Sequence, residues 1–172
     1  YTIVPQWRIN AVVGVPTDKL LDRKRHFYGG SVDADALLPK VSASVYAIRQ
    51  TIDGEVDRSA LGTEMRYFNG GVSATGILDY DQTLRGLNIA SLQGTWQVEE
   101  TSVVNFLYDR RKTPMLMLGN ALFFQDPTLP LAARLRDLLA TGVTIDELRA
   151  RVHATTSNTT QASAVYNVDN YL

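Results

Sequence analysis

Residues 71–81 read GVSATGILDYD, and their side chains alternate between two kinds. One set is apolar and consists of Val72, Ala74, Gly76, Leu78 and Tyr80. The other set is mostly polar and consists of Ser73, Thr75, Ile77, Asp79 and Asp81. A period of two is typical of a β-strand with one apolar face. A soluble sandwich would bury that face in a core, whereas a membrane barrel would turn it toward lipid and line its interior with the charges.

The same alternation recurs along the chain and predicts an all-β meander. We expect eight strands, at residues 6–15, 27–37, 41–50, 61–68, 72–81, 87–98, 103–111 and 160–170. The joints LPK, NGG and EET are short and the other joints are longer, so short and long joints alternate along the sequence. Outer-membrane barrels show this asymmetry, with short periplasmic turns and longer outer loops.

The two phases of the expected strands differ in charge. The apolar phase carries no charge except Arg49, at a loop end where a long side chain can reach water. A basic residue on the lipid face near the midplane of a bilayer costs about 2–4 kcal/mol. We therefore expect the apolar phase to face lipid and the polar phase to line a lumen. The predicted lumen-lining residues are Arg8, Asp33, Asp35, Glu64, Arg66, Asp79 and Asp109.

Aromatic residues of the apolar phase gather toward the two ends of the expected strands. If the short turns are periplasmic, the periplasmic group is Trp7, Tyr67, Trp96 and Tyr166. The group at the opposite end is Tyr28, Tyr80 and Tyr108. Two such belts are typical of membrane barrels, because these rings prefer the interface. The sequence thus predicts one segment, residues 1–172, of an antiparallel up-and-down transmembrane β-barrel or of a larger one; a soluble barrel or sandwich is the alternative.

Residues 112–158, called the insert below, break the alternation. Pro130 suits the first turn of a helix that Gly142 would end. The run Thr144-Ile145-Asp146-Glu147 matches a capping box at the start of a second helix. The sequence predicts a two-helix insert in one long loop, either as an external cap or as a plug folded into the lumen.

Composition limits the function classes. The net charge of −1 gives no support for a nucleic-acid partner. The chain has no Cys, which excludes a disulfide framework and Cys-based metal sites. No run of about 18 apolar residues is present, so we expect no transmembrane helix. The chain begins without Met, and its last residues, YNVDNYL, still resemble a strand, so we expect a piece of a longer protein.

The strongest candidate for catalysis is a pair of acids, Asp79 and Asp81, on one face of a strand. Paired carboxylates serve in glycosidases. We favour a lumen charge ladder neutralised by Arg66, Arg85 or Arg110.

A basic run at residues 23–25 lies in a long loop, and a second basic pair ends the seventh expected strand. These residues are candidates for binding phosphate groups of lipopolysaccharide or another anionic polymer. They are Arg23, Lys24, Arg25, Arg110 and Arg111. His26 and His153 are isolated from other metal ligands, so we expect no metal, no cofactor and no enzymatic activity.

Two stretches resemble a known family. They are VDRSALGTEMRYFNGGVSATGILDYDQTLRGLNIASLQGTWQV at residues 56–98 and YDRRKTPMLMLGNALF at residues 108–123. Over residues 42–148 the chain resembles the C-terminal barrels of proteobacterial outer-membrane proteins that carry tetratricopeptide repeats ahead of the barrel. The resemblance implies a barrel that passes a polysaccharide, beside repeats that bind periplasmic partners. This chain contains no such repeat, so partner binding is not carried over.

The sequence as a whole predicts a channel or export pore in the outer membrane of a Gram-negative bacterium, in contact with the bilayer and lipopolysaccharide. The helical insert would gate or plug the pore. The alternatives are a non-conducting barrel that anchors an envelope assembly, and a soluble β-domain that binds carbohydrate or lipid.

Overall fold

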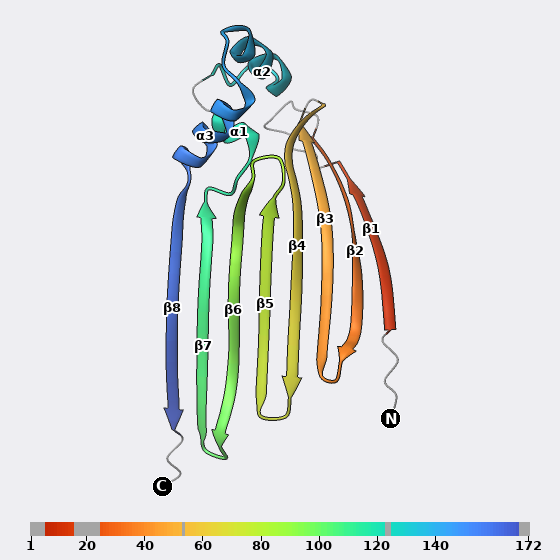
Figure 1. Cartoon of the computed structure of the whole chain (residues 1–172), viewed down its shortest axis with the longest axis vertical. Coiled ribbons are helices and arrows are strands. Elements are labelled where there is room, and N and C mark those ends of the chain that lie inside the picture. The colour runs from red at the N-terminus through yellow and green to blue at the C-terminus, as the bar shows by residue number, and fades with distance from the viewer. Residues whose placement is uncertain (1–5, 16–24, 53, 123–124, 169–172) are drawn as a thin grey trace.

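The computed structural model describes residues 6–15, 25–52, 54–122 and 125–168, and its main element is one antiparallel sheet (Figure 1). The eight strands lie side by side in the order in which they occur along the chain. They are β1 (Gln6–Gly14), β2 (Arg25–Leu38), β3 (Val41–Ile52), β4 (Glu55–Asn69), β5 (Val72–Asp81), β6 (Gly86–Glu99), β7 (Ser102–Thr113) and β8 (Ser157–Val168).

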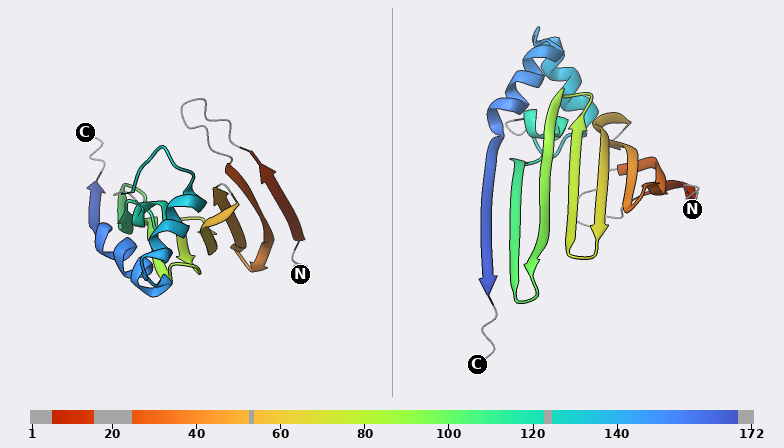
Figure 2. Two further views of the ribbon diagram at one scale, coloured as in Figure 1. Left: turned by 90° about the horizontal axis from the view of Figure 1, so that it is seen from above. Right: turned by 60° about the horizontal axis from the view of Figure 1, so that its bottom comes forward.

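The predicted all-β, up-and-down meander of eight strands is confirmed. The sheet is open, because β1 pairs only with β2 and β8 only with β7 among the described residues. Seen from above, the sheet is curved, and β1 and β8 lie at its opposite edges (Figure 2). Closure into a barrel therefore stays a prediction.

The connection between β3 and β4 differs from the expected long joint. β3 continues to Ile52 and β4 begins at Glu55, so the strict alternation of short and long joints is wrong. The reason is a β-bulge. Gln50 pairs with Arg58, but the next residue of β3 pairs with Val56, which leaves Asp57 as an extra residue. A bulge breaks the period of two, and residues 55–60 therefore do not read as strand.

The turn between β4 and β5 is tight, as the NGG sequence predicts. Gly70 has a φ of +52°, a conformation that glycine adopts without steric strain. At this end of the sheet the strands turn within two residues, at 39–40, 70–71 and 100–101.

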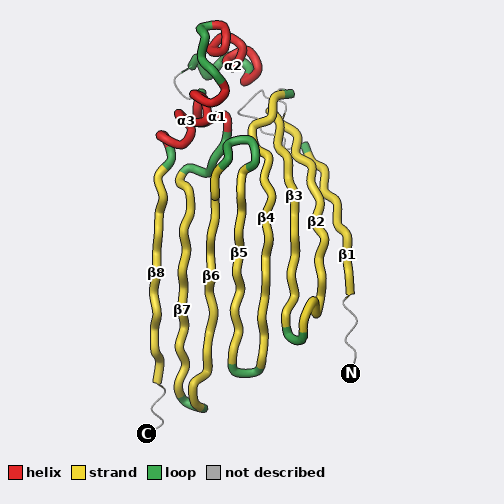
Figure 3. The backbone as a smooth tube through the Cα atoms, viewed as in Figure 1, coloured by secondary structure: helices red, strands yellow, loops and turns green. Residues whose placement is uncertain are grey.

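The insert forms three helices at the other end of the sheet (Figure 3). They are α1 (Leu118–Ala121), α2 (Leu131–Ala140) and α3 (Ile145–Thr155). The two predicted helices are α2 and α3, whereas α1 was not expected from the apolar run around it. None of the described helices has the length and apolar character needed to cross a membrane.

The predicted capping box of α3 is confirmed. The Oγ1 atom of Thr144 accepts a hydrogen bond from the backbone N of Glu147, at 3.2 Å. In return, the backbone N of Thr144 donates to Glu147 Oε2 at 2.7 Å, and this bond holds the pKa of Glu147 below its ordinary value. The box fixes where α3 begins, immediately after the turn from α2.

The hydrophobic core lies where the insert meets the ends of the strands, and not on either face of the sheet. Residues of all three helices form most of it, together with Ile52 at the end of β3 and Leu84 between β5 and β6. Its members are Ile52, Leu84, Leu116, Leu118, Ala121, Leu122, Leu131, Leu135, Leu138, Leu148 and Val152.

The apolar face of the sheet is exposed over all eight strands. Sixteen of its large residues are between 41% exposed, for Tyr108, and 83% exposed, for Ile9. They are Trp7, Ile9, Val13, Tyr28, Val32, Val45, Leu61, Met65, Leu78, Tyr80, Leu92, Trp96, Val98, Tyr108, Tyr166 and Val168. No second layer of described residues covers this face, so the sheet alone has no sandwich core.

Candidate functional site on the polar face of the sheet

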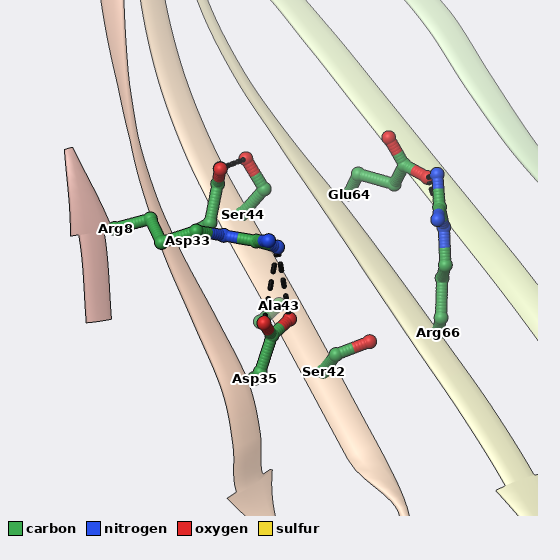
Figure 4. A pocket seen from close by; sticks show the side chains of 8 residues that line it. All are labelled: Arg8, Asp33, Asp35, Ser42, Ala43, Ser44, Glu64 and Arg66. Atoms are coloured by element: carbon green, nitrogen blue, oxygen red, sulfur yellow. Dashed lines mark hydrogen bonds and ion pairs between the residues drawn. The ribbon is translucent and has the colours of Figure 1, made fainter. Parts of the chain in front are cut away.

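Five of the predicted lumen-lining residues surround one hollow on the polar face, with a volume of about 240 Å³ (Figure 4). Strand register brings them together, since Arg8, Asp33, Ser44 and Glu64 are successive partners across β1 to β4. The full lining is Arg8, Asp33, Asp35, Ser42, Ala43, Ser44, Glu64 and Arg66. The hollow is therefore a site shared by four strands.

Both arginines of the hollow are paired with carboxylates. Arg8 lies 3.0 Å from Asp35, and Arg66 lies 2.5 Å from Glu64. Asp33 is held differently, because its carboxylate accepts hydrogen bonds from the neutral side chains of Asn10 and Ser44, each at 2.6 Å. These groups can bind polar solutes through hydrogen bonds and charge, but none of them is arranged as an activated nucleophile.

Asp109, also predicted to line the lumen, lies outside the hollow on β7. The Arg111 guanidinium donates to its carboxylate at 2.6 Å. Asp109 and Glu64 nonetheless belong to one transverse row, which runs through Ile77 and Ser91. The polar phase thus continues from β1 to β7.

Asp79 differs from its predicted role as a residue open to the lumen. It faces the polar side but is only 2% exposed, because other side chains surround it. Arg58 donates to both carboxylate oxygens at 2.8 Å, Tyr46 OH donates at 2.7 Å and Asn88 Nδ2 donates at 3.1 Å. The expected partners of this acid, Arg66, Arg85 or Arg110, were wrong, and Arg58 takes their place.

Asp81, the second acid of the pair, is fully buried and stabilises backbone. Its carboxylate accepts from the backbone N of Leu84 at 2.6 Å and from the backbone N of Ser59 at 3.2 Å. It therefore ties the turn after β5 to β4. Neither Asp79 nor Asp81 has a carboxylate presented to open water, as glycoside hydrolysis would need.

Two β-bulges attach the insert to the sheet. The extra residue of the β4 bulge, Asp57, accepts a hydrogen bond from the backbone N of Gly119 in α1 at 2.8 Å. The extra residue of a bulge in β6, Asn88, accepts from the backbone N of Leu116 at 2.9 Å. Asn88 also donates to Asp79, which faces the polar side of the sheet. The insert is therefore attached on the polar side of the strand ends.

Asp57 lies nearer the insert end of the sheet than Tyr80, the last aromatic residue of β5. Tyr80 pairs with Leu61 of β4, and Asp57 is four residues from Leu61 in the direction of the insert. Burial raises the pKa of its carboxyl above the ordinary value, although the hydrogen bond from Gly119 N acts in the opposite direction. The attachment of the insert is thus a buried polar contact.

Six of the seven residues predicted to form aromatic belts lie toward the strand ends at which they were expected, and the belts themselves stay a prediction. Trp7, Tyr67, Trp96 and Tyr166 lie toward the strand ends with two-residue turns. Tyr28 and Tyr80 lie near the opposite end. Tyr108 is the exception, because it is near the middle of β7 and not at the end where the insert lies.

The structure does not gather the predicted anion-binding residues into one rim. Arg23 and Lys24 lie outside the described residues. Arg25 begins β2 and interacts with Asp57, whereas Arg110 and Arg111 lie near the end of β7, and four strands separate β2 from β7. Arg111 is paired with Asp109 on the polar face, whereas Arg110 lies on the apolar face toward the insert end.

Sequence reasoning missed Arg58, Tyr46, Asn88 and Asp57. The extra residues of the two bulges leave no pattern in a single sequence. Tyr46 did leave a signal, since it is an aromatic residue on the polar phase of its strand. Its ring lies over Gly62, where a Cβ atom would stand 2.2 Å from the ring Cζ, so the glycine makes room for the ring that reaches Asp79.

Comparison of the chain with protein-family models, curated proteins and solved structures gave no match. Within the described ranges, no group of three or more His, Asp or Glu side chains is placed to hold a metal ion.

Proposed function

We propose that the chain forms part of a β-barrel in the outer membrane of a Gram-negative bacterium, and that this barrel is a channel or export pore. The observation that carries the proposal is the long exposed apolar face, opposite a face that bears the arginines and acids. Soluble monomers rarely expose an apolar patch larger than about 300–600 Å². In a bilayer the same face is solvated by acyl chains.

The two open edges support closure in the membrane. Unpaired backbone groups in hydrocarbon cost several kcal/mol each, so membrane sheets close on themselves. Soluble edge strands are blunted with Lys, Pro or bulges. β8 has no charged residue and no Pro, and β1 has one charge, Arg8, on the polar face. Both edges thus suit pairing with further strands or with each other.

Contacts with the lipid headgroups are part of the proposal. Arg110 lies two residues beyond Tyr108 on the apolar face and is exposed. A long basic side chain at that position can reach the phosphate groups of lipid or lipopolysaccharide. Transport of a polysaccharide, implied by the family resemblance, stays a proposal of the same kind.

The insert is proposed to close the pore from one end. It packs over the ends of the strands and is held on the side of the polar face by Asp57 and Asn88. A barrel built from this sheet would have the insert beside or across its mouth. This arrangement favours a cap at the mouth over a plug that fills the length of the lumen.

Replacing residues 114–156 with a short Gly-Ser turn should raise the conductance of the protein in planar bilayers. Thr113 and Ser157 are paired partners, so a turn can join β7 to β8 directly. The expected result is a larger or longer-lived open state than in the intact protein, because the cap is gone.

The comparison variant is the double variant Asp57→Ala and Asn88→Ala, which keeps the insert but removes the two side-chain acceptors that bind the backbone N of Gly119 and of Leu116. It should open more often than the intact protein, with the same unit conductance in the open state. Equal conductance in all three proteins would contradict the gating role. Absence of conductance in all three, with correct insertion, would favour the non-conducting anchor.

A further inference from the structure

The acids of the polar face differ in their pairing with arginine. The hollow contains two arginines and three carboxylates, so one negative charge remains within it. On β7 a third arginine, Arg111, is neutralised by Asp109. The acids near the insert end, Asp57, Asp79 and Asp81, are buried away from the open face. Among the described residues, the surplus charge of the open polar face is therefore located in the hollow.

Within the part of the chain that the structure describes, no cation forms an ion pair with Asp33, the third acid of the hollow. Arg8, its partner in the neighbouring strand, turns its guanidinium toward Asp35, at 3.0 Å (Figure 4). Glu64 is paired with Arg66 on its own strand. The donors that hold Asp33 are the neutral groups of Asn10 and Ser44, which orient the carboxylate without cancelling its charge.

We infer that Asp33 makes the pore prefer cations, and neutral polar solutes after them, over anions. This inference rests on the proposed function, since it assigns a specificity to the same lumen. Acidic side chains on a pore wall select cations, and low-dielectric walls concentrate the field of an uncompensated charge. The preference should be strongest in dilute salt, where the Debye length exceeds about 10 Å.

The test is the reversal potential of the intact protein in a planar bilayer that separates dilute KCl from a tenfold higher concentration. The intact protein should be more permeable to K⁺ than to Cl⁻. Asp33→Asn should lower that permeability ratio roughly sevenfold, because a unit charge about 7 Å from the ion path in water favours K⁺ by a Boltzmann factor of about 2.7 and disfavours Cl⁻ by the same factor.

The matched control is the double variant Arg8→Ala and Asp35→Ala, which removes a neutral ion pair from the same hollow. It should leave the permeability ratio unchanged. An unchanged ratio in Asp33→Asn, or an equal fall in both variants, would overturn the inference. A preference of the intact protein for Cl⁻ would do the same.

The variant Asp33→Cys covers the case in which Asp33→Asn does not fold. The chain has no other Cys, so a thiol reagent would modify that position alone. A reagent that adds a negative sulfonate should restore the preference for K⁺, and a neutral reagent of similar size should not. If the intact protein gave no conductance at all, the proposed pore would be wrong, which is a different result from a pore with the opposite selectivity.

Discussion

Leu92→Arg should block insertion into lipid vesicles or destabilise the inserted protein by about 2–4 kcal/mol, the cost of an arginine near the bilayer midplane on the lipid face of a barrel. Leu92 lies in the middle of β6 on the apolar face and is 46% exposed. Nothing in the described structure packs against it as a core would. The measurement is urea unfolding of the protein refolded into vesicles, followed by tryptophan fluorescence.

The next residue along the strand, Gln93, supplies the control. It is exposed as well but lies on the polar face. Gln93→Arg should change the unfolding free energy far less than Leu92→Arg, because its guanidinium stays in water. Similar effects of the two substitutions, or a larger effect at Gln93, would contradict the assignment of the faces.

Arg58→Ala should destabilise the protein by about 3–5 kcal/mol, the cost of leaving a buried charge without its partner. The Arg58 side chain is 15% exposed and Asp79 is 2% exposed, and the two lie 2.8 Å apart. Tyr46 and Asn88 continue to donate hydrogen bonds to Asp79, but they carry no charge. The free energy of unfolding in denaturant measures the effect.

Two further variants separate burial from pairing. Arg66→Ala breaks an ion pair whose arginine is 67% exposed, and exposed pairs contribute about 0–1 kcal/mol. The double variant Arg58→Met and Asp79→Leu removes both buried charges and should recover much of the lost stability. If Arg58→Ala had as small an effect as Arg66→Ala, the Asp79 network would not be the buried polar centre described above.

Alternation along the chain was sufficient to predict the eight strands, their antiparallel order and the two faces. In GVSATGILDYD the pattern survives because β5 contains no extra residue of its own. In this strand, successive side chains point to opposite faces of the sheet in strict alternation, so the sequence pattern and the structure agree. Most of the large apolar residues that this pattern assigned to one face are exposed in the structure.

The bulges explain most of what could not be predicted. At Asp57 and Asn88 one extra residue shifts the alternation of the side chains between the two faces. The position of a bulge depends on pairing with the neighbouring strand, and the pattern within one segment carries no information about that pairing. The start of β4 and the partner of Asp79 were missed for this reason. The neighbourhood of Asp79 is formed by residues of β3, β4 and β6, up to 33 positions away from Asp79 in the chain.

The placement of the insert also depends on tertiary contacts. Its helices were predictable from a capping box and a leucine stripe, but these signals say nothing about which end or face of the sheet they contact. Gly119 and Leu116 reach the bulges through backbone groups, and backbone hydrogen bonds leave no residue-specific signal.

Fluorescence quenching of single-cysteine variants along β5 by brominated lipids tests the orientation of the sheet most directly. The chain has no natural Cys, so each introduced thiol can carry one fluorophore. After refolding into vesicles, labels at Ala74 and Leu78 should be quenched by bromines in the acyl chains, and labels at Ser73 and Thr75 should be reached only by quenchers dissolved in water. Quenching by lipid at Ser73 and Thr75, or at none of the four positions, would contradict a barrel wall with its apolar face in the bilayer.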